Sequence, residues 1–283
     1  MAANGCRLRT KRKKLTTFDI IVFSILTCLF IILVVPFWSI IVTSFSTNES
    51  YIRQPFSLWP GEFTWANYMS VFARGSGLLV AYKNTVIISV IGTFVGMLFM
   101  TMAAYAMSRK FPGKRGIFMY FLFAMFFGGG TIPTYLNIKN LGLNNTFTGV
   151  IMLTLCSVGH MIILMKGFDG IPKEMEEAAV IDGASQITTF FRIMLPLIGP
   201  AIFSVGLLVF INCWNEYLYA LSFMTDPKMR TVPVGIALLP SNYQLPWGDI
   251  SAASVVATVP LIVLVLIFQK KIVAGLTTGG IKE

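Results

Sequence analysis

The residues best suited to contact a partner lie in a polar stretch between two long apolar segments. Acidic Glu177 precedes the small pair Ala178-Ala179, and Gly183 follows after three further residues. A carboxylate offers an ion pair to a cationic side chain of another protein. Small side chains let a second surface approach closely, and a glycine permits a left-handed turn of the backbone. The pattern predicts a docking element and not a catalytic centre.

A second polar set lies inside an apolar segment. His160, the only histidine, follows Ser157 by three residues, so the two share a helical face. Such a pair raises the hypothesis of an intramembrane protease that uses a serine nucleophile. No glycine-rich nucleophile turn surrounds Ser157, and catalytic pairs are usually assembled from different segments. A packed polar pair is the favoured interpretation.

A third set, near the end of a later apolar segment, comprises Asn212, Asn215, Glu216 and Tyr219. On a continuous helix these four side chains fall on one face. Counting from Pro200 at ~1.5 Å per residue places Asn212 about 18 Å and Glu216 about 24 Å along the helix. An acid at that depth is costly and usually faces a cavity or a partner. The sequence predicts a polar stripe that lines either a solute path or a helix–helix contact.

The composition decides what kind of elements must position these residues. The chain has 283 residues, is 55% hydrophobic and only 12% charged, and is too apolar for an ordinary soluble domain. A transmembrane helix needs about 20 mostly apolar residues. The sequence predicts an all-α membrane protein with six such helices, at 18–42, 82–107, 116–136, 146–168, 197–219 and 250–272.

The basic residues predict the orientation. Sixteen of the 22 Lys and Arg fall in segments on the same side as the N-terminus, and six fall on the other side. The positive-inside rule therefore places both termini in the cytoplasm, after a basic N-terminal segment 1–17. The net charge of +10 favours contact with anionic inner-leaflet lipid over nucleic acid, because the charges sit at membrane ends. The four cysteines share no metal-binding or disulfide pattern, and no metal site is expected.

The polar segment 170–196 divides into two short helices around a turn. Glu174, Glu176 and Glu177 suit the positive end of a first helix, and Gly183 suits its left-handed cap. Ser185 is a good N-cap for a second, amphipathic helix, which Pro196 closes. A hairpin resting on the inner leaflet would explain its phenylalanines. That alternative does not explain the fixed spacing of the small and acidic residues.

Read as EAA-x3-G-x9-I-x-L-P, this segment resembles the coupling motif of ABC importer permeases, with matches at Glu177, Ala178, Ala179, Gly183, Ile193, Leu195 and Pro196. Further segments resemble the carbohydrate branch of that family, of the maltose/oligosaccharide type. They include 63–68, 83–85, 214–217 and 231–235. The resemblance covers nearly the whole chain. It implies a type I ABC importer permease fold, with residues 18–283 forming one transmembrane domain.

The resemblance also implies partners. A second permease would form a heterodimer with this chain, two copies of a cytoplasmic ATPase would drive transport, and an extracytoplasmic solute-binding protein would deliver the sugar. No G-x-x-x-x-G-K-[ST] sequence is present, so ATP would be bound and hydrolysed by the separate ATPase. The chain itself is expected to be neither an enzyme nor a cofactor-binding protein. It is expected to be a multi-pass protein in the plasma membrane of a prokaryote.

The matched motif residues of 170–196 would couple to the ATPase, with Glu177 paired to an arginine there. Asn212, Asn215, Glu216 and Tyr219 would line the substrate path, because sugars are bound by amides, acids and aromatic faces. Hydrogen bonding to the second permease is an equal alternative for these four residues. Two other functions stay open: a stand-alone secondary transporter, for which Glu216 is the only acid well inside a helix, and an importer of the same fold for a non-sugar solute.

Overall fold

The computed structural model describes residues 16–73, 77–239 and 247–277, with the side chains of 272–277 left out. These residues form helices and no strands, apart from one isolated bridge between Ser46 and Phe63. The long helices are α1 (Thr17–Ser44), α4 (Leu78–Ser108), α5 (Lys114–Phe126), α8 (Val158–Asp169), α12 (Gly199–Trp214) and α15 (Trp247–Thr277). The shorter ones are α2 (Asn48–Arg53), α3 (Ala66–Phe72), α6 (Thr131–Asn140), α7 (Phe147–Thr154), α9 (Glu174–Ile181), α10 (Gln186–Thr189), α11 (Leu195–Leu197), α13 (Leu218–Phe223) and α14 (Val232–Leu238).

In the described part of the chain, three helices are long and apolar enough to cross a membrane alone. They are α1, α4 and α15, with mean hydropathies of 3.0, 2.2 and 2.6. Three further pairs pass the same test together while bent at a short break: α5 with α6 by 111°, α7 with α8 by 48°, and the segment Gln186–Leu197 with α12 by 82°. The all-α architecture with up to six spans agrees with the sequence prediction.

The predicted ranges 116–136, 146–168 and 197–219 are not single helices. The first is split between α5 and α6, where three consecutive glycines interrupt the chain and Gly130 has a φ of +83°. The second is split before Ser157, whose extended backbone caps α8. In the third, α12 ends at Trp214, before the predicted end. The ranges 18–42, 82–107 and 250–272 lie within α1, α4 and α15, which extend one to five residues further at their ends.

The ends of the chain carry predictions that the structure does not describe. Residues 1–15 of the basic segment 1–17 and the last residues 278–283 lie outside the described residues. The placement of both termini in the cytoplasm therefore remains a prediction from the charge pattern.

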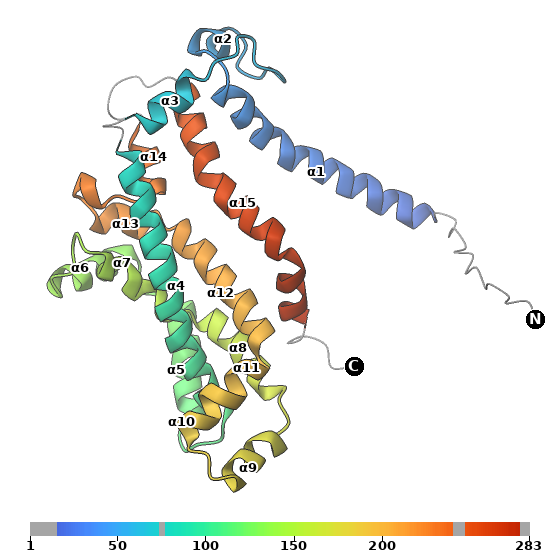
Figure 1. Ribbon diagram of the computed structural model, residues 1–283, viewed down its shortest axis with the longest axis vertical. Coiled ribbons are helices and arrows are strands. Elements are labelled where there is room, and N and C mark those ends of the chain that lie inside the picture. The colour runs from blue at the N-terminus through green and yellow to red at the C-terminus, as the bar shows by residue number, and fades with distance from the viewer. Residues whose placement is uncertain (1–15, 74–76, 240–246, 278–283) are drawn as a thin grey trace, which may run out of the picture.

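Helix α4 is the centre of the bundle and runs from the end that carries α2 and α3 to the end that carries α9 (Figure 1). It packs mainly against α12 and α8, and also against α7 and α14. Methionines of α4, including Met97 and Met100, pack with α8 residues such as Met161 and Phe168 in the main apolar core. Because α4 contacts most of the other helices in the bundle, these helices are positioned relative to it.

Two glycines of α4 let α7 approach closely. A Cβ placed on Gly96 would lie 2.7 Å from the backbone oxygen of Thr154, closer than real Cβ atoms come to any neighbour. The Thr154 hydroxyl also donates to the Gly92 carbonyl at 3.2 Å. The Gly92-x-x-x-Gly96 spacing is therefore a packing contact of the small-residue type.

Two polar residues of the segments 63–68 and 83–85 hold the loops onto the long helices. The Asn67 amide donates to the carbonyls of Ser44 and Ser46 and so ties α3 to the end of α1. The Asn84 amide donates to the carbonyls of Lys228 and Arg230. Buried backbone groups need such partners, and these amides supply them. Asn67 and Asn84 therefore have structural roles.

Helix α1 stands apart from the rest. It packs against α15 near its C-terminal end and diverges from it toward its N-terminus (Figure 1). Its only buried residues are Val42, Thr43 and Ser44, whereas Phe18 and Phe23 are 70% and 71% exposed. An apolar surface of this length is stable only in contact with lipid or another apolar protein.

We expect Gly96→Ala to destabilise the protein and Gly116→Ala to leave it as stable or more stable. The added methyl at Gly96 meets the Thr154 backbone, and overpacking of this kind costs about 1–3 kcal/mol. Gly116 lies in α5 with open space around its Cβ position, so alanine there gains up to ~1 kcal/mol of helix propensity. Thermal unfolding of both purified variants in detergent measures the difference. Equal melting temperatures would show that the α4–α7 contact is not tight.

Candidate functional site

The hairpin predicted at 170–196 is present, and its first arm is α9. Gly183 has a φ of +78°, its N–H donates to the Val180 carbonyl, and the Ala184 N–H donates to the Ala179 carbonyl, each at 3.0 Å. These two bonds form the Schellman motif that ends helices at a left-handed residue. Gly183 thus fixes the angle at which the chain leaves α9.

The second arm begins at Ser185, whose hydroxyl accepts from the Thr188 N–H at 3.2 Å as an N-cap. The helix widens to a π-helical segment, Phe190–Met194, where the Leu195 N–H reaches back to the Phe190 carbonyl. Pro196 has no N–H and its ring crowds the preceding turn, which favours this wider winding. The chain then turns by 82° into α12.

The motif residues face different ways. Glu177, Ala178, Gly183 and Pro196 are exposed, whereas Ala179 is only 4% exposed. Ile193 and Leu195 are half-buried and pack on the main core. The motif therefore contains an outward set, available to a partner, and an inward set that attaches the hairpin to the bundle.

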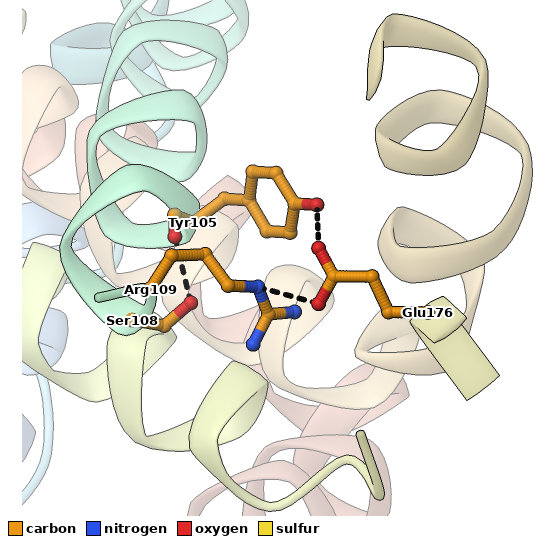
Figure 2. A network of polar contacts seen from close by, with 4 residues as sticks. All are labelled: Tyr105, Ser108, Arg109 and Glu176. Carbon is orange, nitrogen blue, oxygen red and sulfur yellow. Dashed lines mark hydrogen bonds and ion pairs between the residues drawn. The ribbon is translucent and has the colours of Figure 1, made fainter. Parts of the chain in front are cut away.

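Glu176, which precedes the motif, faces the bundle, whereas its neighbour Glu177 faces outward. Its carboxylate accepts a hydrogen bond from the Tyr105 hydroxyl at 2.6 Å and forms an ion pair with Arg109 Nε at 2.8 Å (Figure 2). Sequence reasoning grouped Glu176 with the exposed acids and missed both partners. The spacing of Tyr105 and Arg109, four residues apart on one helical face, was the available signal.

An open hollow of about 710 Å³ borders this network. Its charged lining combines cations at the α4–α5 turn with Lys173, which precedes α9, and two acids of α9: Arg109, Lys110, Lys114, Lys173, Glu176 and Glu177. The exposed side chains of Val180 and Ile181, 63% and 85% exposed, complete it. This end of the molecule offers both charge and apolar surface to a partner.

A second hollow, of about 160 Å³, lies in the bundle where two helices are interrupted. One interruption separates α7 from α8, and the other separates α12 from α13. Its polar lining comprises Thr154, Ser157, His160, Asn212, Glu216 and Tyr219. Interrupted backbone in an apolar surrounding persists only where it is buried in protein or lines a cavity. Residues on both sides of the two breaks line this hollow.

Three of the four predicted stripe residues line this hollow, and the fourth does not. Asn212, Glu216 and Tyr219 line it together, and Glu216 Oε1 accepts from the Tyr219 N–H at 2.9 Å. Asn215 lines a different hollow, beside Trp214 and α14. The single-face prediction was wrong for Asn215: its N–H still bonds to the Ile211 carbonyl at 3.0 Å, and the helical register is lost only after it, before Tyr219 in α13.

Ser157 and His160 lie in this same hollow. Ser157 is the extended residue that caps α8, and His160 is in the first turn of that helix. The Nδ1 atom of His160 is buried and makes no hydrogen bond within the described structure. The pair is better described as part of the polar lining than as the isolated packed pair that the sequence suggested.

Interrupted apolar helices around a polar hollow, with a charged hairpin at one end, define a multi-pass membrane protein of the transport class. Residues 75–278 match the family described as the binding-protein-dependent transport system inner membrane component. The chain belongs to this family. It is a permease of the inner membrane and not an enzyme, and this assignment replaces the protease and stand-alone transporter hypotheses.

Two relatives and one solved structure cover most of the chain. The trehalose/maltose transport system permease protein MalG of Thermococcus litoralis is 41% identical over 261 residues, covering 89% of this chain and 92% of that protein. The sulfoquinovosyl glycerol transport system permease protein SmoH of Agrobacterium fabrum is 35% identical, covering 86% and 87%. A chain of a bacterial ABC transporter involved in the import of the acidic polysaccharide alginate matches with a TM-score of 0.80 at 25% identity, covering 89% and 95%.

The different exposure of the two alanines gives a direct test of the hairpin geometry. We expect Ala179→Leu to destabilise the attachment of α9 by about 1–3 kcal/mol through overpacking. Ala178→Leu adds the same atoms on the exposed face and should not. Limited proteolysis within 170–196 and thermal unfolding report the effect. Equal protection of the two variants would contradict the inward placement of Ala179.

Proposed function

We propose that this chain is one permease subunit of an ATP-driven, binding-protein-dependent importer of sugars or oligosaccharides. The observation that carries the proposal is the α9–α10 hairpin, which presents Glu177 and Ala178 outward at one end of a bundle of this family. The names of the similar permeases support a sugar as the solute. The proposed complex contains a second permease, two copies of a cytoplasmic ATPase and a solute-binding protein.

The hairpin has the properties that transmission of force requires. It is short, its turn is fixed by the Gly183 cap, and its second arm is buried at Phe190 and Met194. A rigid element attached to the core moves the core when a partner pushes it. Glu177 is placed to pair with a cationic side chain of the ATPase, which binds and hydrolyses ATP.

Exposed apolar faces support a second permease as partner. Phe94 of α4 and Phe126 of α5 are 72% and 74% exposed, and α1 is exposed almost throughout. Lipid covers part of this surface, and the remainder suits a homologous subunit. At the end opposite α9, the loop aromatics Phe56 and Trp59 are 89% and 71% exposed, which suits a solute-binding protein.

The hollow between the interrupted helices supports the assignment of the solute path. Its amide, carboxylate, hydroxyl and imidazole groups match the hydrogen-bonding groups of a polyhydroxy solute. Ligand sites usually measure about 300–1,000 Å³, and this hollow holds about 160 Å³. We therefore assign it as one wall of a path that the second permease completes. Hydrogen bonding of the same groups to that permease is the alternative.

We expect Glu177→Lys and Gly183→Pro to abolish solute uptake while the protein still inserts in the membrane. The first reverses the charge offered to the ATPase. The second removes the N–H bonded to Val180 and demands a φ near −65° where the backbone has +78°. The measurement is uptake of labelled sugar by cells that express the complete system.

Gly142→Pro is the matched control for the hairpin variant. Gly142 ends α6 with a φ of +69° and donates to the Lys139 carbonyl at 3.0 Å, so its local cost is similar. Helix α6 lies away from α9 (Figure 1), and the Gly142→Pro variant should retain more uptake than Gly183→Pro at equal protein level. Undiminished uptake in both hairpin variants would falsify the coupling role.

We expect Asn212→Ala and Glu216→Gln to weaken the binding of solute in the path, with Asn215→Ala as the control. Loss of a hydrogen bond that involves a charged group costs about 1.5–3 kcal/mol, or roughly tenfold or more in affinity. The half-saturation concentration for uptake should rise for the first two variants and stay unchanged for Asn215→Ala, which lines another hollow. Competition by unlabelled sugars against amino acids identifies the solute class. If all three variants have the same half-saturation concentration for uptake, Asn212 and Glu216 do not line the solute path.

A further inference from the structure

Glu176 and Glu177 are neighbours in α9, but only Glu177 is free to meet a partner. Glu177 is exposed, whereas the Glu176 side chain is 26% exposed and faces α4. Both oxygens of Glu176 are engaged: Oε1 accepts from the Tyr105 hydroxyl at 2.6 Å, and Oε2 lies 2.8 Å from Arg109 Nε (Figure 2). The two acids therefore have different tasks.

The two partners of Glu176 come from the C-terminal end of α4: Tyr105 is in its last turn, and Arg109 is its C-cap. Tyr105 and Arg109 are four residues apart, so their side chains share a face, and the Arg109 guanidinium lies 4.8 Å from the centre of the Tyr105 ring. The cation and the hydroxyl together hold one carboxylate from two directions. The Arg109 contact is a close ion pair without hydrogen-bond geometry, and the Tyr105 hydroxyl supplies the directional hydrogen bond.

Little else attaches α9 to the helix that it faces. Ala179 is its only buried residue, and an eight-residue helix is not stable on its own. Among the described residues, the other ion pair, Lys166 with Asp169, lies within one helix. Within the described residues, the contact between Glu176 and Arg109 is thus the one ion pair that links distant elements: it joins α9 to the residue that caps α4.

Tyr105 extends the contact into the core. Its ring packs against Phe168 of α8 with 5.3 Å between ring centres, and against Phe190 of the hairpin's second arm with 5.1 Å. Both arms of the hairpin therefore meet α4 at Tyr105. A displacement of the hairpin acts on α4 at this point.

The same helix reaches the wall of the small hollow. Gly96 lies nine residues before Tyr105, about 14 Å along α4 at 1.5 Å per residue. Its backbone touches Thr154, which lines the hollow. No proline interrupts α4 between the two points. One continuous helix therefore contacts the hairpin at one place and, at another, Thr154 in the wall of the hollow.

We propose that Glu176, Arg109 and Tyr105 form a clamp that transmits movement of the α9 hairpin to α4 and, through Gly96 and Thr154, to the wall of the hollow. The proposal rests on the proposed function, because it describes how the same hairpin acts on the transport path. The three are positioning residues: Glu177 meets the ATPase, and the clamp carries the movement inward.

The test is a charge-exchange cycle in the complete transporter reconstituted in lipid vesicles. Glu176→Arg and Arg109→Glu are made singly and together, and sugar uptake and ATP hydrolysis are measured in the same vesicles. We expect each single variant to lower the uptake per ATP hydrolysed at least fivefold, and the double variant to recover it to within twofold or threefold. Recovery in the double variant identifies a direct interaction.

Glu174→Gln is the matched control, because it removes an exposed acid from the same turn of α9. It should keep the wild-type uptake per ATP. Tyr105→Phe keeps the ring in the core and removes only the hydroxyl, and should lower the ratio about twofold. If the charge variants do not assemble, the uptake per ATP hydrolysed is measured in Tyr105→Phe and Glu176→Gln instead, and a lowered value in either supports the clamp.

Wild-type uptake per ATP in assembled Glu176→Arg, or in both Tyr105→Phe and Glu176→Gln, would overturn the clamp. Absence of recovery in a stably assembled double variant would do the same. Failure of the proposed function is seen separately, as an unmodified complex without ATP-driven sugar uptake. In that case hydrogen exchange of the α9 amides still tests the attachment: it should be faster in Glu176→Gln than in Glu174→Gln, and equal rates would overturn it.

Discussion

The close contact between α4 and Thr154 is the constraint on which the rest of the bundle depends. Without side chains at Gly92 and Gly96, α4 meets the end of α7 directly, and a Cβ on Gly96 would collide with its backbone. This contact places the break between α7 and α8 opposite the break after α12. Each interruption would be costly in lipid, and each is tolerated because the polar groups converge on a shared hollow.

The same central helix explains how the two functional regions are related. Helix α4 contacts Thr154 of the hollow's lining through Gly92 and Gly96, and the hairpin is held at the C-terminal end of α4 by Tyr105 and Arg109. The outward residues Glu177 and Ala178 are thereby separated from the groups that line the hollow. Solute contact and partner contact use different side chains on one connected frame.

Sequence patterns were informative where they depend on local rules. The left-handed cap at Gly183, the N-cap at Ser185 and the apolar spans α1, α4 and α15 follow from residue type and spacing, and the structure contains each of them. Long-range polar contacts were not predictable in this way. Asn67 and Asn84 stood out as motif residues, but only the fold shows that their amides hold distant backbone carbonyls.

The sequence by itself determined the class of protein, the number of apolar segments and the position of the hairpin, because hydropathy and helix caps act over neighbouring residues. The tertiary structure alone decided which side chains meet. It turned Glu176 inward to Arg109 while Glu177 stayed exposed, and it placed Asn215 and its neighbour Glu216 in different hollows at the break that follows α12. A helical register extrapolated through a break cannot anticipate this, because the direction of the chain after a break is set by packing between elements distant in sequence.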